Sequence, residues 1–283
     1  MATVQKTTVL ITGCSPNGIG HAMAKHFHAH NYYVFATTRN PSTSTPTSLA
    51  SLPDIEILEL DVTLPHTIAR CKDIVAKRTG GTLDVLVNNA GVEFNSPLLD
   101  TDVAEAKRLF DVNVWGVLGM VQAFAPLLVK AGGVVFNQSS IDAELNMVWA
   151  GIFASSKAAV ARMSETLRIE LEPLGVRVVT SICGSVDTPM FGKPGGPMEL
   201  PETSYYHGVQ DAAWKERMDH QRQATNVDVL AGKLVRDIVG GARGVVWHGA
   251  FAPLVRWAGW LNILWVVDRL INSARGLGQV ERR

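Results

Sequence analysis

The sequence predicts an α/β protein with a doubly wound parallel sheet of about seven strands and helices on both faces. Short apolar and β-branched runs alternate with helical patterns along most of the chain. The first such run ends in a glycine-rich loop that opens a helix, as in dinucleotide-binding folds. The chain has 283 residues, of which 47% are hydrophobic, so it can bury one large core. We expect a single domain over residues 1–283.

Composition favours small-molecule chemistry in a reducing compartment. The 26 acidic and 26 basic residues balance, so the basic surface of a nucleic-acid-binding protein is absent. Cys14, Cys71 and Cys183 are odd in number and far apart, which argues against a disulfide framework or a zinc site. Residues 1–6 lead into an apolar strand without a signal-peptide pattern. We therefore expect a cytoplasmic protein with no metal and no nucleic-acid partner.

The first strand is expected over residues 7–11, and the loop after it is expected to bind a dinucleotide. Glycine permits a tight turn, lets backbone N–H groups approach a pyrophosphate, and opens a helix whose positive end faces the phosphates. The glycine spacing differs from the common fingerprint, and such loops also occur as plain turns. The candidate cofactor-binding residues are Gly13, Ser15, Gly18, Ile19 and Gly20.

The helix that follows this loop carries four histidines, namely His21, His26, His28 and His30. They lie on several faces of the helix, and no carboxylate stands among them. We expect surface histidines rather than a metal cluster.

The second strand, expected over residues 32–37, ends near Arg39. In this fold class an acid at that point accepts the ribose 2′-hydroxyl of NAD. An arginine instead suits a 2′-phosphate, which it can bind by charge-assisted, bidentate hydrogen bonds. The alternative is a solvated loop arginine. Arg39 therefore favours NADP(H) as the cofactor. The Ser-, Thr- and Pro-rich residues 41–53, which connect the second strand to the third, are expected to form a loop.

The third and fourth strands are expected over residues 55–60 and 83–87, with a helix over 65–78 between them. Asp61 and Val62 follow the third strand, and Asp61 could equally cap the helix.

The fourth strand ends in the motif Asn88-Asn89-Ala90-Gly91. Its small residues permit close backbone approach to a ligand, and its asparagines can tie adjacent strand ends together. A long helical stretch over residues 102–129 follows and contains Asn113, which on its own would be a hydrogen-bonding core residue.

A fifth strand over residues 133–138 delivers Ser140 at its carboxyl end. A helix that begins near Ala150 carries Phe153 and Lys157 four residues apart, and positions i and i+4 share a helix face. The Ser140 hydroxyl and the Lys157 ammonium should therefore meet beside the strand ends, where open α/β sheets bind ligands.

This pattern resembles the active site of the short-chain dehydrogenase/reductase superfamily, which has a serine, a tyrosine 13 residues later, and a lysine four further on. Ser140 and Lys157 match, but position 153 is phenylalanine. The resemblance implies that the tyrosine hydroxyl protonates the nascent alkoxide, while the lysine lowers that hydroxyl's pKa and holds the cofactor ribose. It also implies that the main chain at Asn113 seats a water of the proton relay. Phe153 can neither donate nor accept the proton.

The resemblance also implies further contacts with the cofactor. Asp61 and Val62 match the position that contacts its adenine ring. Residues 183–188 resemble a PG-x-V-x-T segment on the nicotinamide side, with Cys183 in place of its proline. The stretches TGCSPNGIG, ATTRN, LDVLVNNAGV, LFDVNVWGV and LRIELEPLGVRVV look most like the branch of NADPH-dependent 1-acyldihydroxyacetone-phosphate reductases and related fungal natural-product reductases. The implied activity is NADPH-dependent ketone reduction on an apolar small molecule. The cofactor residues implied by the motifs are Asn89, Ala90, Gly91, Lys157, Gly184, Val186 and Thr188.

Phe153 leaves several explanations open. The chain has lost its proton donor naturally, or the residue is a deliberate replacement of the kind that traps a bound complex. A native Phe153 would suit reduction of an iminium cation, because hydride addition then yields a neutral amine and needs no proton. Non-redox cyclase chemistry and a pure binding role are further alternatives.

A sixth strand is expected over residues 176–182, a helix near Val227, and a last strand over 244–248. The connection 189–226 is rich in Pro and Gly at its start and is expected to form a lid on the substrate side. It carries Tyr205, Tyr206 and His207, which are candidates for substrate contacts but are expected at the surface.

The tail, residues 250–283, contains Trp257, Trp260 and Trp265. Only 11 residues separate Arg256 from Asp268, too few to cross a bilayer. We expect a helix that packs in the core or against another subunit of a homo-oligomer. The alternative is an interfacial helix whose tryptophans lie at the headgroups of a membrane.

Overall fold

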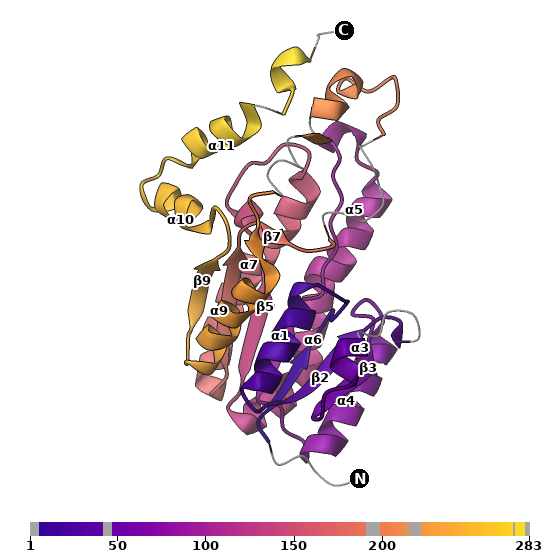
Figure 1. Ribbon diagram of the computed structural model, residues 1–283, viewed down its shortest axis with the longest axis vertical. Coiled ribbons are helices and arrows are strands. Elements are labelled where there is room, and N and C mark those ends of the chain that lie inside the picture. Colours follow the sequence, from indigo (N-terminus) through magenta and orange to yellow (C-terminus); the bar gives the residue numbers. More distant parts are fainter. Residues whose placement is uncertain are drawn as a thin grey trace.

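A seven-stranded parallel sheet forms the centre of the molecule, in the order β3-β2-β1-β4-β5-β6-β9 (Figure 1). The computed structural model describes residues 6–41, 47–190, 199–212, 214–215, 222–273 and 275–280. Every pairing in this sheet is parallel, so all carboxyl ends of its strands share one edge, and the strand order reverses between β1 and β4. The fold class is as predicted. The strands are Thr8–Ile11 (β1), Tyr33–Thr38 (β2), Ile55–Glu59 (β3), Val85–Asn88 (β4), Val134–Gln138 (β5), Arg177–Cys183 (β6) and Gly244–His248 (β9).

Helices cover both faces of the sheet because side chains alternate along each strand. In β1, Val9 and Ile11 belong to one core cluster with Phe27, whereas Leu10 belongs to a second cluster with Phe124. Helices α1 (Ile19–Ala29) and α9 (Val227–Val239) cover the first face. The second face is covered by α4 (Pro65–Thr79), α6 (Gly116–Ala131) and α7 (Gly151–Leu171), with α5 (Val103–Phe110) beyond the end of α6.

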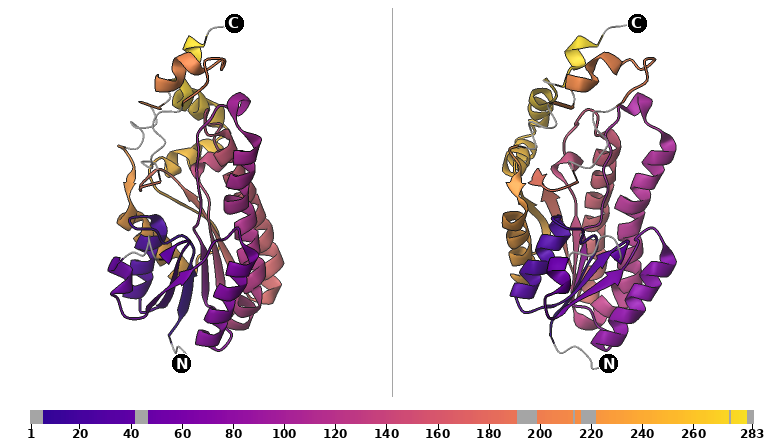
Figure 2. Two further views of the ribbon diagram at one scale, coloured as in Figure 1. Left: turned by 90° about the vertical axis from the view of Figure 1, so that its right-hand side faces the viewer. Right: turned by 45° about the vertical axis from the view of Figure 1, so that its right-hand side comes forward.

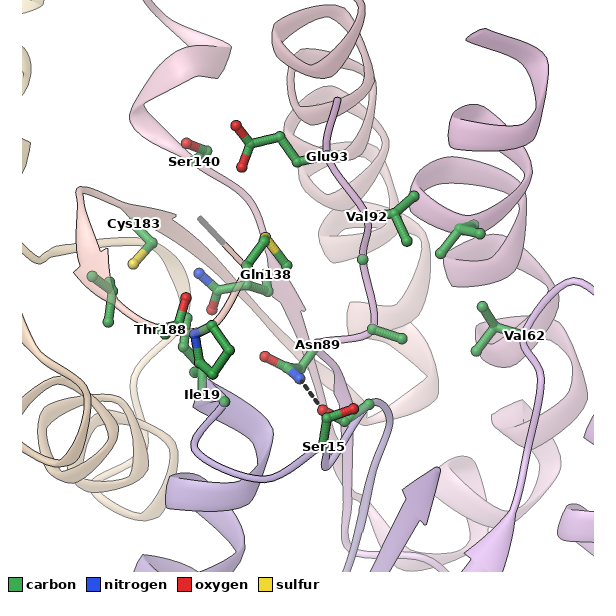
Figure 3. A pocket seen from close by; sticks show the side chains of 18 of the residues that line it. Ser15, Ile19, Val62, Asn89, Val92, Glu93, Gln138, Ser140, Cys183 and Thr188 are labelled. Atoms are coloured by element: carbon green, nitrogen blue, oxygen red, sulfur yellow. Dashed lines mark hydrogen bonds between the residues drawn. The ribbon is translucent and has the colours of Figure 1, made fainter. Parts of the chain in front are cut away.

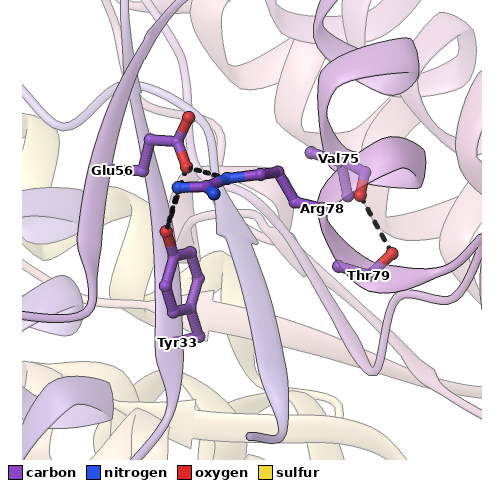
Figure 4. A network of polar contacts seen from close by, with 5 residues as sticks. All are labelled: Tyr33, Glu56, Val75, Arg78 and Thr79. Carbon is purple, nitrogen blue, oxygen red and sulfur yellow. Dashed lines mark hydrogen bonds and ion pairs between the residues drawn. The ribbon is translucent and has the colours of Figure 1, made fainter. Parts of the chain in front are cut away.

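A half-buried polar network fixes the edge of the sheet at β2, β3 and α4 (Figure 4). Arg78 Nε donates to Glu56 at 2.8 Å, and Arg78 Nη2 donates to the Tyr33 hydroxyl at 2.9 Å. The Tyr33 hydroxyl donates to the same carboxylate at 3.0 Å. These bonds connect three elements that are separate in the sequence.

The predicted helix over residues 102–129 is three segments. Between α5 and α6 lies a π-helical segment, Asp111–Trp115, which contains Asn113. The hydrophobic period alone does not distinguish such a widened turn from an ordinary one. Val103–Ala131 as a whole is the one helix in the described residues that is long and apolar enough, by length and composition only, to cross a membrane, and 50% of its most apolar window is buried in this fold.

Two expectations about the first half of the chain are wrong. Within residues 41–53, Thr47–Ala50 forms a short helix, α3, because Leu49 is fully buried in the core; residues 42–46 lie outside the described part. His21 is buried rather than at the surface. Its Nδ1 accepts from the Asn17 backbone N–H at 3.1 Å, and its Nε2 shares a hydrogen bond of 2.9 Å with the Ser48 hydroxyl of α3.

The C-terminal part extends beyond the carboxyl edge of the sheet. It comprises α10 (Ala252–Trp260), α11 (Leu264–Ser273) and a 3-10 turn, Leu277–Gln279. Both views of Figure 2 place these helices at the end of the molecule opposite the N-terminus. A two-stranded sheet of β7 (Val186–Asp187) and β8 (Thr225–Asn226) lies between the main sheet and this tail.

Candidate active site

A cavity of about 520 Å³ lies at the carboxyl edge of the sheet, where the strand order reverses (Figure 3). It brings together residues that are distant in the sequence, from the first loop to β7. Of the predicted site residues, Gly20 and Asn113 are outside its lining. Those that line it are Gly13, Ser15, Gly18, Ile19, Arg39, Asp61, Val62, Asn89, Ala90, Gly91, Ser140, Phe153, Lys157, Gly184, Val186 and Thr188.

The glycine-rich loop is held against the end of β4 by Asn89. Its side-chain Nδ2 donates to the carbonyl oxygens of Thr12 at 2.9 Å and Gly13 at 3.1 Å. Gly13 has φ +73°, and a Cβ there would lie 2.9 Å from Ala90 Cα. A Cβ at Gly20 would lie 2.6 Å from Asn89 Nδ2. Gly20 therefore lets α1 approach the loop and does not face the cavity.

The asparagines after β4 tie neighbouring strands together, as their position indicated. Asn88 Nδ2 donates to Asn137 Oδ1 of β5 at 2.8 Å, and Asn137 Nδ2 donates to Ser164 of α7 at 2.8 Å. These buried bonds fix the end of β5, from which Ser140 follows.

Arg39 lies exposed at the far end of the cavity, just after β2, and Asp61 lines the same end. Asp61 Oδ1 accepts from both the backbone N–H and the hydroxyl of Thr63. It does not cap the next helix, because Leu64 occupies the N-cap of α4.

Ser140, Phe153 and Lys157 converge at the other end of the cavity. Ser140 caps a 3-10 turn, Ile141–Ala143, and its Oγ accepts from the Asp142 backbone N–H at 3.2 Å. Phe153 and Lys157 are both buried, and Lys157 Nζ donates to the Gln138 carbonyl at 3.1 Å. Burial lowers the pKa of Lys157 to about 8, and the carboxylates of Asp142 and Glu93 act in the opposite direction.

Asn113 lies behind the site and holds the segment after the Asn88–Gly91 motif. Its Oδ1 accepts from the Val92 backbone N–H at 2.8 Å, and its Nδ2 donates to the Val92 carbonyl at 2.9 Å. The same Nδ2 donates to Ser156 Oγ of α7 at 3.1 Å. Asn113 thus joins the π-helical segment, the cavity wall and α7.

A second cavity, also of about 520 Å³, meets the first at Ser140 and Phe153. Glu93 and Gly184 also line both cavities. Most of the remaining wall is apolar and comes from residues 251–275, the part of the chain that contains α10 and α11. A Cβ at Gly184 would overlap the Ala250 carbonyl, so this position requires glycine.

The described part of the connection 189–226 contributes only Pro189 and Met190 to these cavities. Tyr206 packs edge-on against Trp149 at 4.9 Å between ring centroids, and His207 Nδ1 is 2.8 Å from the Leu200 carbonyl. Tyr206 and His207 are half-buried, and neither they nor Tyr205 line either of the two cavities. Residues 191–198, 213 and 216–221 of the expected lid lie outside the described part.

The glycine loop, the asparagine motif and the Ser140–Lys157 pair thus occupy one cavity, in the order typical of a nucleotide-dependent dehydrogenase. A model of the short chain dehydrogenase family matches residues 7–195. The chain belongs to this family. It is therefore an NAD(P)-dependent oxidoreductase of the short-chain dehydrogenase type.

Relatives and solved structures are similar over nearly the whole chain. The short-chain dehydrogenase cctT of Talaromyces islandicus is 48% identical over 254 residues, which cover 88% of each chain. The NADPH-dependent 1-acyldihydroxyacetone phosphate reductase of Schizosaccharomyces pombe is 35% identical over 90% of this chain and 86% of its own. A short-chain dehydrogenase of Burkholderia cenocepacia, solved with NADP, is 25% identical with a TM-score of 0.73, over 95% of this chain and 98% of its own.

The first cavity fits a nicotinamide dinucleotide, as the family implies. Gly13 and Gly18 of the glycine loop and Ile19 at the start of α1 line the cavity, as a pyrophosphate site requires, and the cavity also holds a buried polar atom without a partner. Gln138 Oε1 has no hydrogen-bond partner within the described structure, and its amide points into the cavity beside Cys183 (Figure 3). A bound donor such as an amide or a hydroxyl would satisfy it.

Gln138 and Glu93 are site residues that the sequence analysis missed. Gln138 stands two residues before Ser140, and Glu93 two residues after Gly91. Their nearness to recognised motifs was the available signal. The direction of each side chain depends on the path of the backbone, which spacing does not give.

Proposed function

We propose that this chain uses NADPH, in preference to NADH, to reduce a carbonyl group of an apolar small molecule. The observation that carries the proposal is the meeting of the two cavities at Ser140 and Phe153. Arg39 at the end of β2 supports the choice of NADPH, since its guanidinium suits a 2′-phosphate. The NADPH-dependent relative and the neighbour solved with NADP also support it.

The residues at this junction divide the reaction between them. NADPH held in the first cavity would supply a hydride. Ser140 presents its hydroxyl at the junction, where it can donate a hydrogen bond to a carbonyl oxygen. Lys157 supplies positive charge below the pH of its lowered pKa, about 8. Phe153 has no proton to give, so protonation of the product oxygen is the step that this site performs poorly.

A second candidate substrate is an iminium cation, and a specific observation favours it. Glu93 lines both cavities, Asp142 lines the second, and the charges of both favour the protonated form of Lys157. The same carboxylates would favour a cationic substrate beside the Phe153 ring. Glu144 and Asp187, which lie close in the sequence to Ser140 and Thr188, are exposed and line neither cavity.

The test offers the purified protein NADPH labelled with deuterium at nicotinamide C4, together with a cyclic ketone or a cyclic iminium ion. Deuterium in the alcohol supports the carbonyl reading, and deuterium in the amine supports the iminium reading. NADPH binding without consumption of either substrate would contradict both and favour a cyclase or a binding role. Titration of cofactor fluorescence measures binding separately from turnover.

A further inference from the structure

An apolar surface covers the outer side of α10 and α11. Six large side chains there are each more than half exposed, from 53% for Leu261 to 75% for Trp260. Monomeric soluble proteins rarely expose so many large apolar groups together. We call this set the tail surface: Leu254, Trp257, Trp260, Leu261, Trp265 and Leu270.

The opposite side of the same helices is firmly packed on the protein. Ala252, Val255 and Val267 are buried in a core cluster with Ile141 and Ile182. Polar bonds add to this packing. Asp268 accepts from the Asn146 backbone N–H at 3.0 Å and from its side-chain Nδ2 at 2.6 Å. The exposure of the tail surface therefore belongs to the folded state.

The second cavity opens within this surface. Leu254, Trp257, Leu261 and Leu270 are exposed and at the same time line the cavity. Its inner end is formed by Ser140 and Phe153. A molecule that moved from the tail surface to the junction of the cavities would therefore remain in contact with apolar side chains.

We propose that the tail surface binds an anionic lipid surface, and that apolar substrate enters the second cavity from that surface. Tryptophan is favoured at the headgroup level of a bilayer, and helices of 9 and 10 residues are too short to span one, so α10 and α11 would lie in its plane. The entry of substrate rests on the proposed function, whereas the binding of lipid does not.

The charges of the tail favour lipid over a second copy of the chain. Arg256 and Arg269 are exposed, whereas the one acid in the described tail, Asp268, is bonded to Asn146. Two copies that paired through this surface would bring like charges together. Anionic headgroups would instead complement them, because basic residues near the membrane are attracted to the negative surface potential.

Co-sedimentation with vesicles tests the proposal. The full chain is mixed with vesicles of phosphatidylcholine alone or of phosphatidylcholine with phosphatidylserine. We expect stronger binding to the anionic vesicles and at least a tenfold loss of partitioning in Trp257→Gln/Trp260→Gln. The matched control is Trp115→Gln, because Trp115 is 57% exposed on the π-helical segment, outside the tail. The control should bind as the unmodified chain does.

Further measurements keep the test independent of folding and of catalysis. Arg256→Gln/Arg269→Gln should remove the preference for anionic vesicles while the circular dichroism spectrum stays unchanged. Failure to bind either vesicle would overturn the proposal. So would a dimer in light scattering that dissociates in Trp257→Gln/Trp260→Gln, because the second copy would then be the occupant. NADPH titration reports on the proposed function whatever the vesicles show.

Discussion

The ammonium nitrogen of Lys157 lies 5.6 Å from the centroid of the Phe153 ring, one turn away on α7. Both side chains are buried; Phe153 lines both cavities, and Lys157 lines the first. A hydroxyl added to this ring would join a site that already holds a hydrogen-bond donor, Ser140, and a cation. The site therefore differs from one with a tyrosine proton donor by a single oxygen atom, the hydroxyl oxygen that the ring of Phe153 lacks.

Replacing Phe153 by tyrosine should raise turnover on a simple ketone by roughly 10²- to 10⁴-fold, the usual contribution of a positioned general acid. NADPH affinity should hardly change. Steady-state kinetics and a fluorescence titration measure the two quantities. An unchanged ketone rate would show that another group already supplies the proton, or that position 153 does not face the reacting oxygen.

Replacing Arg39 by aspartate should reverse the cofactor preference from NADPH to NADH. The carboxylate would repel a 2′-phosphate and accept a hydrogen bond from a 2′-hydroxyl. Arg162→Asp, at an exposed arginine on α7 outside both cavities, is the control and should keep the NADPH preference. Equal affinities of the unmodified chain for the two cofactors would remove the role assigned to Arg39.

Replacing Glu93 by glutamine should slow iminium reduction more than ketone reduction, by about tenfold in kcat/KM. The carboxylate stabilises a cation at the junction, and a neutral ketone gains nothing from it. The exposed Glu144 provides the matched control, Glu144→Gln. Parallel losses on both substrates would mean that Glu93 has a structural role.

Replacing Lys157 by methionine should stabilise the cofactor-free protein below pH 8, by up to about 3 kcal/mol. Burial lowers the pKa of Lys157 from 10.5 to about 8, so below pH 8 the fold bears the full cost of a buried ammonium. Between pH 8 and 10.5 the unfolded chain binds more protons than the folded one, so the unmodified protein gains stability as pH rises. The stability advantage of Lys157→Met over the unmodified protein should therefore disappear across this pH range.

Urea unfolding across this pH range measures the difference between Lys157→Met and the unmodified protein. Lys130→Met, at an exposed lysine, is the control. If the two variants respond to pH alike, burial of the ammonium is not the cause.

Replacing Gly184 by alanine should destabilise the protein by about 3 kcal/mol, because the added Cβ would overlap the Ala250 carbonyl. Gly208→Ala is a suitable comparison, since a Cβ at Gly208 has open space around it. Thermal melts of the two variants and the unmodified protein measure the loss of stability at each position. A mild effect at Gly184 would show that the start of the tail can shift to make room.

The sheet, its order of elements and much of the candidate site could be predicted from the sequence because local rules govern them. Alternating helix and strand patterns define a parallel sheet, whose carboxyl ends must share an edge. Ser140 at a strand end and Lys157 on the next helix then had to meet there. Phe153 could be placed with them because it shares a helix face with Lys157.

What could not be predicted depends on partners distant in the sequence. The buried ring of His21 is hydrogen-bonded to Ser48 on α3, a helix that its Ser- and Thr-rich sequence does not suggest. The π-helical turn at Asn113 is coupled to Val92. The second cavity depends on where α10 and α11 pack, and their apolar pattern alone suits a core, an oligomer contact or a membrane surface.

The two cavities draw on different parts of the chain. Within the described part of the chain, the first is lined by residues between Gly13 and Met190, all inside the stretch that the family model matches. The second takes most of its wall from residues 251–275, outside that stretch. Substitutions in the tail can therefore reshape the second cavity, the proposed space for a substrate, while the first cavity stays intact. Selection for a new substrate can therefore act on the tail and leave the residues of the first cavity unchanged. A chimaera that exchanges the tail with that of a relative would make the same kind of change.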